Sequence, residues 1–468
     1  MKKSIIAIFA AAAFMVSCTK KLDVTPTDSL PIDEALSDLP MIKNALAGAY
    51  DAMQSVSYYG RNYWVMTETS GDNIYIAAKN SNRFITSFQR SYTTLDGDVE
   101  DFWSQAYATI LRADNVVNNV DSVDGDVAEK SRVKGEALFI RALAHFDLVN
   151  MFGKPYNQGN GAQPGVPLKL KYALEKPKRN TVGEVYAQVI ADLKKADTLL
   201  AATTETDKVH ATKYAAEALL ARVYLYKGAN DSAIIYASKV IAANYQLTQP
   251  DGLADFYNSP GKSKEEIFTL AFVANESFGS DNIGQIYLKP GYGDMRVSPD
   301  LTAVFTGADL RQSLYIGTFA DGSTGEKTNR KFTGQDGQAG MHSPKILRLA
   351  EMYLIRAEAY AKTGQAALAI ADLNTLRASR GAAALSGIAD SKVLDNVLDE
   401  SRREFMFEGH RYFDLIRNGR DIVRNFCHDI REITAPCTFS ATATTVICPI
   451  PQAEINTNPN MEQNEGYK

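Results

Sequence analysis

One pattern occurs three times in this chain: GEALFIRALAHF (135–146), AEALLARVYLYK (216–227) and AEMYLIRAEAYA (350–361). Each copy has a glutamate, an arginine five residues later and, four residues beyond the arginine, a ring from His145, Tyr226 or Tyr360. Residues four apart lie on the same face of a helix. The small residues between them allow a second helix to approach closely while the ring fills the groove. The pattern therefore predicts three packed helices.

A glycine and a second apolar series follow two of the copies. Gly228 precedes Ile234 and Val240, and Gly364 precedes Ile370 and Leu373. A helix, a tight turn and a second helix form the repeat unit of tetratricopeptide proteins. The three copies are too widely spaced for a simple tandem array, so large insertions are expected between them. The predicted fold class is mostly α, with tetratricopeptide-like helical hairpins.

The N-terminal segment is typical of an exported lipoprotein. Lys2 and Lys3 precede an apolar run over residues 5–16, which Ser17 and Cys18 follow. The run is too short to span a bilayer permanently, and it has the features of a secretory signal. A cysteine directly after a small residue is similar to a lipobox, so residues 1–17 are expected to be cleaved and Cys18 to carry the lipid.

Residues 18–31 are polar, with prolines and no helical period, and are expected to form an extended tether. The body would then run over 32–468, as one large domain or two fused halves. Apolar residues recur at helical spacing over about 32–248 and again over about 344–468. Between them, about 249–343 is rich in Gly, Asn, Asp, Ser and Pro, which predicts a loop-rich insertion. A second irregular stretch, 55–97, is rich in aromatic residues.

The composition excludes several classes of function. Hydrophobic residues make up 45% and charged residues 22% of the 468-residue chain, which is typical of a globular protein. The formal net charge of -5 leaves no basic surface with which to bind phosphates, so nucleic acid is not an expected partner. No HExxH motif, paired cysteine motif, GxSxG elbow or complete phosphate-binding loop occurs. Neither a metal nor a cofactor is therefore predicted.

Glu404 and Glu408 are one helical turn apart, as paired catalytic carboxylates can be. They are interleaved with Arg402, Arg403, Arg411 and Arg417, and this alternation favours internal ion pairs that keep both carboxylates ionised. The segment is therefore interpreted as structural, and the protein is not predicted to be an enzyme.

Three further cysteines lie near the C-terminus: Cys427, Cys437 and Cys448. In an exported protein Cys437 and Cys448 could close a hairpin-like loop, but an odd number leaves one thiol over. The sequence leaves the connectivity open.

Several separated segments resemble the SusD/RagB family of Bacteroidetes. They are LDVTPTDSL (22–30), TSGDN (69–73), FWSQAYATILRADNVV (102–117), EMYLIRAEAYAKTG (351–364), ESRREFMFEGHRYFDLIR (400–417) and PIPQAEINTNPNMEQNEGY (449–467). The resemblance covers nearly the whole mature chain. It implies a lipid-anchored outer-membrane protein that faces the cell exterior. Such a protein would capture oligosaccharides or peptides for a TonB-dependent SusC-like transporter.

Aromatic residues on the irregular stretches are the candidate ligand contacts. The apolar face of a pyranose stacks on a ring while its hydroxyls bond to planar polar groups. Trp64 with Tyr59 forms the first set, and packing beneath a loop is the alternative for Trp64. The second set is Phe278, Tyr287, Tyr292, Met295 and Arg296. Tyr292 lies between two glycines and is expected to be exposed, whereas the helical spacing of Trp103 predicts a core position.

Three polar residues complete the predicted site. Asp72 and Asn73 match a family segment near the ligand face, and turn formation is the alternative for both. Arg83, like Arg296, is expected to orient hydroxyls or carboxylates, with a surface salt bridge as the alternative. The predicted function is nutrient binding and delivery. A tetratricopeptide adaptor that binds a protein or peptide is the alternative, and an exported glycan-degrading enzyme is a weaker third.

Overall fold

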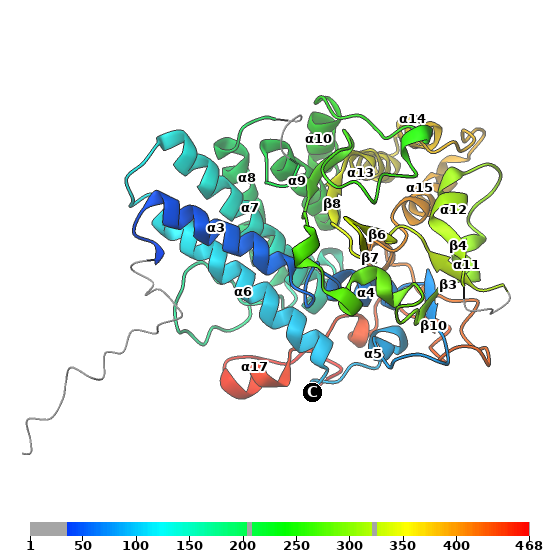
Figure 1. The fold of residues 1–468 in the computed structure, drawn as a ribbon, viewed down its shortest axis with the longest axis horizontal. Coiled ribbons are helices and arrows are strands. Elements are labelled where there is room, and N and C mark those ends of the chain that lie inside the picture. Colours follow the sequence, from blue (N-terminus) through cyan, green and yellow to red (C-terminus); the bar gives the residue numbers. More distant parts are fainter. Residues whose placement is uncertain (1–34, 204–207, 321–324, 468) are drawn as a thin grey trace, which may run out of the picture.

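Eight helices of the computed structural model form one array, in a structure that describes residues 35–203, 208–320 and 325–467 (Figure 1). They are α3 (Leu39–Gln54), α6 (Gly97–Asn119), α7 (Val127–Phe152), α8 (Val182–Leu199), α9 (Lys213–Lys227), α10 (Asn230–Ile241), α13 (Leu349–Lys362) and α14 (Ala366–Ser379). Each helix packs on the next in this order. This confirms the predicted scaffold of helical hairpins. The signal, Cys18 and the tether lie outside the described residues.

The sequence explains where these helices begin and turn. Asp38, Asp96, Asp126 and Thr212 each accept a hydrogen bond from a backbone N–H of the first turn, which satisfies a donor that the helix itself leaves unpaired. Gly228 and Gly364 have φ of 80° and 75° at the tight turns of the last two hairpins, a backbone conformation that glycine adopts without steric cost.

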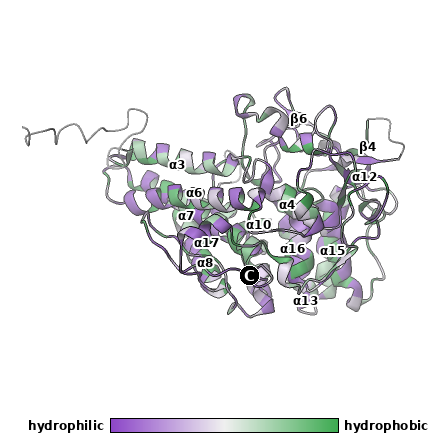
Figure 2. Ribbon diagram, turned by 90° about the horizontal axis from the view of Figure 1, so that it is seen from below, coloured by the Kyte–Doolittle hydropathy of each residue, from purple (hydrophilic) through white to green (hydrophobic). Residues whose placement is uncertain are grey.

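The helices bury one face each. On α3 the buried residues Leu39, Ile42, Leu46, Ala49 and Met53 recur at three and four positions, as an amphipathic helix requires. Figure 2 shows hydrophobic and hydrophilic residues alternating along this helix. Trp103 on α6 is buried, as its spacing predicts. No helix among the described residues is both long and apolar enough to cross a membrane.

The arginine of the repeated pattern ties helices together. Nε and Nη2 of Arg141 on α7 donate to the two carboxylate oxygens of Asp192 on α8, at 2.8 and 2.7 Å. Arg356 on α13 makes the same paired contact with Asp372 on α14, also at 2.8 and 2.7 Å. The second copy differs, because Arg222 on α9 pairs with Glu351 of the next hairpin, Nη2 to Oε2 at 2.7 Å.

Short elements build the rest of the molecule. The helices are α4 (Asn62–Ser70), α5 (Ile85–Gln89), α11 (Pro299–Thr302), α12 (Leu310–Tyr315), α15 (Asp390–Glu404), α16 (His410–Arg417) and α17 (Gln452–Thr457). Within the described ranges the strands form five antiparallel pairs: β1 (Ile74–Ile76) with β3 (Met295–Val297), β2 (Glu266–Thr269) with β8 (Lys345–Arg348), β4 (Ile316–Thr318) with β5 (Lys327–Asn329), β6 (Gly334–Gln335) with β7 (Gln338–Ala339), and β9 (Ile422–Val423) with β10 (Thr438–Phe439). The prediction that residues 55–97 are irregular is wrong for α4, in which all nine residues are buried. A helix enclosed on every side shows no apolar period.

A buried ion-pair network joins the segment between α10 and α13 to the C-terminal helices. It consists of Glu265, Arg311, Lys331, Arg348, Arg380, Glu404 and Glu408. Glu404 accepts hydrogen bonds from the guanidinium groups of Arg311, Arg348 and Arg380. Because buried charges are costly unless paired and hydrogen-bonded, the network fixes how the loop-rich segment sits on α15.

Candidate functional site

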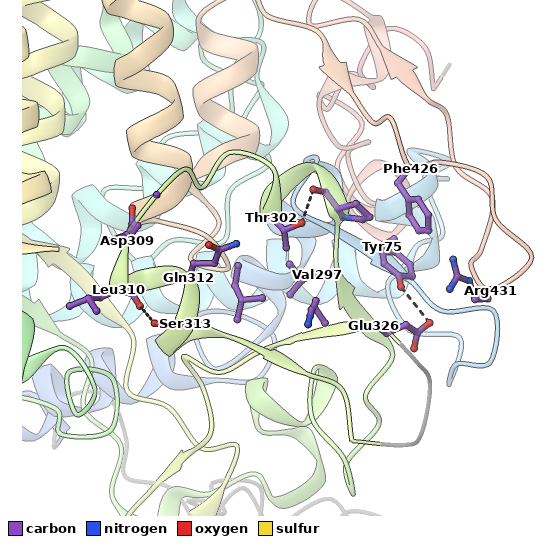
Figure 3. Close-up of a pocket in the computed structure, with 16 residues that line it drawn as sticks. Tyr75, Val297, Thr302, Asp309, Leu310, Gln312, Ser313, Glu326, Phe426 and Arg431 are labelled. Carbon is purple, nitrogen blue, oxygen red and sulfur yellow. Dashed lines mark hydrogen bonds between the residues drawn. The ribbon is translucent and has the colours of Figure 1, made fainter. Parts of the chain in front are cut away.

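A cavity of about 770 Å³ opens beside β1, α11 and α12 (Figure 3). It is lined by Tyr75, Thr302, Gln312, Ser313, Lys327, Phe426 and Arg431, among others. Figure 3 shows Tyr75, Glu326, Phe426 and Arg431 at one end and Asp309, Leu310 and Ser313 at the other. The volume is within the range of small-molecule sites, and the mixture of rings and polar groups is typical of them.

Two rings form one end of the cavity. The centroids of Tyr75 and Phe426 are 5.0 Å apart in an edge-to-face arrangement, the geometry that aromatic quadrupoles favour. Tyr75 is only 4% exposed, whereas Phe426 is half-buried. The Tyr75 hydroxyl donates to Oε1 of Glu326 at 3.4 Å. Phe426 therefore offers the accessible apolar surface, and Tyr75 holds it in place.

Segments far apart in the sequence meet at this end. Strand β1 pairs with β3, which puts Tyr75 opposite Arg296. Beyond the strand, the N–H of Ala78 donates to the carbonyl of Arg431, and the N–H of Ile433 donates to the carbonyl of Ile76, both at 2.8 Å. The loop that carries Phe426 and Arg431 is thus added to the edge of the β1–β3 pair.

A disulfide staples the same loop. Cys427 is bonded to Cys437, and Cys448 is buried as a free thiol. The suggested pairing of Cys437 with Cys448 is therefore wrong, because the antiparallel pair β9–β10 brings Cys427 and Cys437 together across the base of the loop. His428 lies beside the two sulfur atoms, but sulfurs bonded to each other are not the thiolates that bind metal.

The other end of the cavity rests on the ion-pair network. Asp309 caps α12 and accepts hydrogen bonds from Nε and Nη2 of Arg311, at 2.9 and 2.7 Å. Arg311 is 1% exposed and also donates to Glu400 and Glu404 on α15. This wall is consequently rigid, which preorganises the cavity for a ligand.

The first predicted set of ligand contacts, Trp64 and Tyr59, does not lie on the surface. Trp64 is on α4, 4% exposed, with its ring stacked 6.0 Å from that of Phe332. Tyr59 is 2% exposed, and its hydroxyl donates to Asp147 together with the hydroxyls of Tyr58 and Tyr63. Burial raises the pKa of Asp147 to about 6. The prediction that Trp64 and Tyr59 face a ligand on an exposed loop is wrong, because the rings pack inside the molecule.

Asp72 and Asn73 are also buried, at 4% and 0% exposure. Asp72 accepts hydrogen bonds from Nε and Nη2 of Arg411, both at 3.0 Å. The side chain of Asn73 accepts from Arg402 at 2.8 Å and donates to Glu68. These contacts tie the segment after α4 to α15 and α16, so neither residue faces the cavity.

Most of the second set lies behind the cavity. Met295 and Tyr287 are 0% and 1% exposed, so their predicted contact with a ligand is wrong for the same reason. Arg296 is buried on β3, where Nε donates to Oε2 of Glu326 at 3.0 Å and the guanidinium stacks on Phe319. Arg296 thus orients Glu326, which lines the cavity, and does not reach the ligand space itself.

Arg83, Tyr292 and Phe278 remain half-buried. The guanidinium of Arg83 lies 3.7 Å from the centroid of the Tyr292 ring, and Nη2 donates to the Tyr292 hydroxyl at 2.8 Å. Phe278 packs edge-to-face against Phe272. Arg83 and Tyr292 are brought together as a stacked pair on loops next to β1 and β3, which makes them the accessible part of the predicted set.

The arrangement of carboxylates does not suit acid–base chemistry. Glu404 and Glu408 are 3% and 2% exposed. Burial alone would raise the pKa of Glu408, but Arg348 and Lys331 lower it to about 2, and three arginines hold the pKa of Glu404 well below its usual value. The prediction of internal ion pairs is confirmed, although the partners come from other elements than the neighbouring arginines.

The residues that sequence reasoning missed are Gln312, Lys327, Phe426 and Arg431. Tyr75 stood in an aromatic stretch, but nothing in the sequence links that stretch to residues some 350 positions later. The usable signal was the cysteine pair, since a stapled loop in an exported protein is a rigid place for contact residues.

Comparison with known proteins agrees with this architecture. Residues 20–225 match the family model described as "Starch-binding associating with outer membrane", and residues 306–467 match the model of the SusD family. SusD-like protein P2 of Formosa agariphila is 25% identical, over 89% of this chain and 91% of that protein. The starch-binding protein SusD of Bacteroides thetaiotaomicron is 37% identical over 26% of this chain and 21% of its own length.

A solved structure of a SusD superfamily protein from Bacteroides thetaiotaomicron superposes with a TM-score of 0.83. It is 27% identical and the match covers 91% of this chain and 99% of that chain. The two family models, the full-length relative and the shared fold lead to one conclusion: the chain belongs to the SusD/RagB family.

Proposed function

We propose that this protein binds an oligosaccharide non-covalently at the outer membrane, in the cavity between Tyr75, Gln312 and Phe426. The observation that carries the proposal is an open space of about 770 Å³ in which an accessible ring lies beside amide, hydroxyl and charged groups. Sugar recognition needs this combination, because a pyranose has an apolar face and a rim of hydroxyls. The descriptions of the matching family and of SusD itself support a glycan ligand.

The proposal includes no chemical step. The paired carboxylates of α15 and its following turn are buried and held by cations. The cavity therefore serves capture and release. A lipid on Cys18 would anchor the protein to the membrane, and a SusC-like TonB-dependent transporter would receive the ligand. Replacement of Cys18 by serine should release the protein from the membrane fraction.

Arg83 and Tyr292 are proposed as rim contacts of the same site. Their loops adjoin the cavity walls, since Ser81 contacts Asp294 next to β3 and the guanidinium of Arg296 donates to the carbonyl of Gly293. A longer oligosaccharide that extends out of the cavity would meet the stacked pair. Phe278, packed on Phe272, is the more distant candidate.

Affinity electrophoresis through gels that contain starch, dextran, polygalacturonate or dextran sulfate tests the proposal. We expect retardation of the wild type by at least one polymer and a loss of about tenfold in affinity for Phe426→Ala, since a stacked ring contributes on the order of 1 kcal/mol beyond its area. Tyr292→Ala should have a smaller effect on the same polymer.

The matched control is Tyr172→Ala, which removes an aromatic ring that is 57% exposed and lies outside the cavity. Equal retardation of wild type, Phe426→Ala and Tyr292→Ala would contradict the proposed site. Release of reducing sugar by the purified protein would contradict its assignment as a binding protein. Capture of peptides without any glycan would favour the adaptor.

A further inference from the structure

The charges around the cavity indicate which oligosaccharides fit it. We propose that the ligand is anionic, carrying carboxylates or sulfate esters, and that Lys327 together with Arg431 recognises the negative groups. The inference rests on the proposed function, because it names the ligand class of the same cavity.

Both carboxylates among the described residues that line the cavity, Glu326 and Asp309, are already paired with arginines. Glu326 is 8% exposed, and its two oxygens are occupied by Nε of Arg296 at 3.0 Å and the hydroxyl of Tyr75 at 3.4 Å. Asp309 is also 8% exposed, and both of its oxygens accept hydrogen bonds from Arg311. Carboxylates are strong acceptors of hydroxyl protons. Because both are paired with arginines, neither presents an unpaired negative charge to a ligand.

The accessible charge is positive. Lys327 lines the cavity on β5, is half-buried, and forms no ion pair with any described residue. Its Nζ donates to Oγ1 of Thr318 at a long 3.4 Å. A lysine so placed keeps donors available for a ligand, and a partly buried site screens its charge less than open solvent does.

Arg431 adds a second cation at the ring end of the cavity (Figure 3). Its side chain is 53% exposed and pairs with Asp429 two residues away, Nη2 to Oδ2 at 2.8 Å. Nε also donates to Oδ1 of Asp429 at 2.9 Å, so the pair is bidentate and fixes the orientation of the guanidinium. The N–H groups of Nη1 and the second N–H of Nη2 remain, and they can donate two parallel hydrogen bonds to a carboxylate or sulfate of the ligand.

The remaining polar groups suit this ligand. The side chain of Gln312 forms no hydrogen bond with any described residue and offers both an amide N–H and an amide oxygen. The exposed Ser313 hydroxyl donates to the carbonyl of Leu310 at 3.2 Å, which leaves its oxygen as an acceptor for a ligand. The protein as a whole is acidic, with a formal charge of -5, so general charge attraction would not produce binding of a polyanion, and a local cationic site has to do so.

Two matched pairs of polymers test the inference in affinity gels. Polygalacturonate is compared with its fully methyl-esterified form, and dextran sulfate with dextran, so that charge changes while the backbone stays. We expect at least tenfold tighter binding of the charged member of one pair, and weakening of that binding as NaCl rises from 0.05 to 0.5 M, on the order expected from charge screening. The carboxylate and sulfate pairs distinguish the two sources of charge.

Lys327→Gln should weaken binding of the preferred polyanion about tenfold, as loss of a charge-assisted hydrogen bond does, and Arg431→Gln should act in the same direction. The control is Lys195→Gln, an exposed lysine on α8 outside the cavity. Circular dichroism and thermal melting verify that the variants fold.

Three outcomes would overturn the inference. Equal affinity for the charged and the uncharged polymer of each pair would show a neutral-sugar site, and so would an equal loss of affinity for both polymers in Lys327→Gln. Either result would leave the proposed function intact. Binding of poly-L-glutamate but of no glycan would assign the cations to an acidic peptide. Absence of binding to any of the polymers would contradict the proposed function and the inference with it.

Discussion

Replacement of Glu404 by glutamine would test whether the buried ion-pair network holds the loop-rich face on the helical array. The side chain of Glu404 is 3% exposed and accepts hydrogen bonds from three arginines, with Arg311 Nη1 at 2.9 Å and Arg380 Nε at 3.0 Å from Oε2. Glutamine has almost the same shape but no charge, and its amide group places N–H donors against a guanidinium. Breaking one partner of a buried charge cluster costs about 3 to 5 kcal/mol.

The expected change in melting temperature follows from the size of the chain. Unfolding entropy is about 2 cal/mol/K per residue, so a chain of 468 residues has roughly 1 kcal/mol/K. Glu404→Gln should therefore lower the melting temperature by about 3 to 5 °C at pH 7. Glu465→Gln, at an exposed carboxylate near the C-terminus, is the matched control and should change it by less than about 1 °C.

The pH dependence gives the deciding observation. The arginines hold the pKa of Glu404 well below its usual value against the effect of burial. A carboxylate with a lowered folded-state pKa stabilises the fold above its unfolded pKa and loses that contribution as the pH falls. The difference in melting temperature between the wild type and Glu404→Gln should thus be constant from pH 8 to 5 and shrink below pH 4.5. A difference below 1 °C at pH 7, or one that persists unchanged at pH 3, would refute the reasoning.

Three other predictions concern single features. Glu432→Gln should raise the melting temperature at pH 8 but not at pH 4.5. Burial raises the pKa of Glu432 to about 7, and neither carboxylate oxygen has a hydrogen-bond partner among the described residues, so its ionisation destabilises the fold as the pH rises from 4.5 to 7. Equal shifts of the melting temperature at both pH values would contradict this. Trp64→Ala should destabilise the fold by about 3 to 5 kcal/mol in thermal or urea melts, as deletion of a buried ring does. An unchanged melting curve together with a loss of ligand binding would instead show that Trp64 contacts the ligand. Joint replacement of Cys427 and Cys437 by serine should cost about 3 kcal/mol, worked from the ten-residue separation of the loop ends; a reductant should reproduce the loss in the wild type, and a melt insensitive to both would show that the loop is held without the bond.

The helical array was predictable because its signals are local. The Glu–Arg–ring pattern and the glycines at 228 and 364 each act within one or two turns of helix, and a surface helix shows its buried stripe in its own sequence. Helix α4 carries no such stripe, since all its residues are buried. Tyr63 and Trp64, together with the tyrosines just before the helix, were therefore interpreted as part of an exposed loop.

The candidate site was much less predictable. Its walls come from β1, α12, β5 and the loop after β9, and the contacts that join them are backbone hydrogen bonds and strand pairing between distant segments. Such pairing leaves no trace in either partner's sequence alone. The exposure of a ring depends on those contacts, which is why Phe426 was missed while the buried Tyr59, Tyr287 and Trp64 were favoured.

Arg222, the arginine of the middle repeat, links the third hairpin of the array to the fourth. Arg356 pairs with an anion of its own hairpin, and Arg141 pairs with Asp192 of its own hairpin and Asp114 of the preceding one, but Arg222 depends on Glu351, which lies 129 positions further along the chain. A fragment that ends after α10 would lose both the carboxylate that pairs with Arg222 and the Ile346 carbonyl that accepts its second hydrogen bond. We therefore expect a truncation between the third and fourth hairpins to destabilise the array more than one that keeps these two hairpins together.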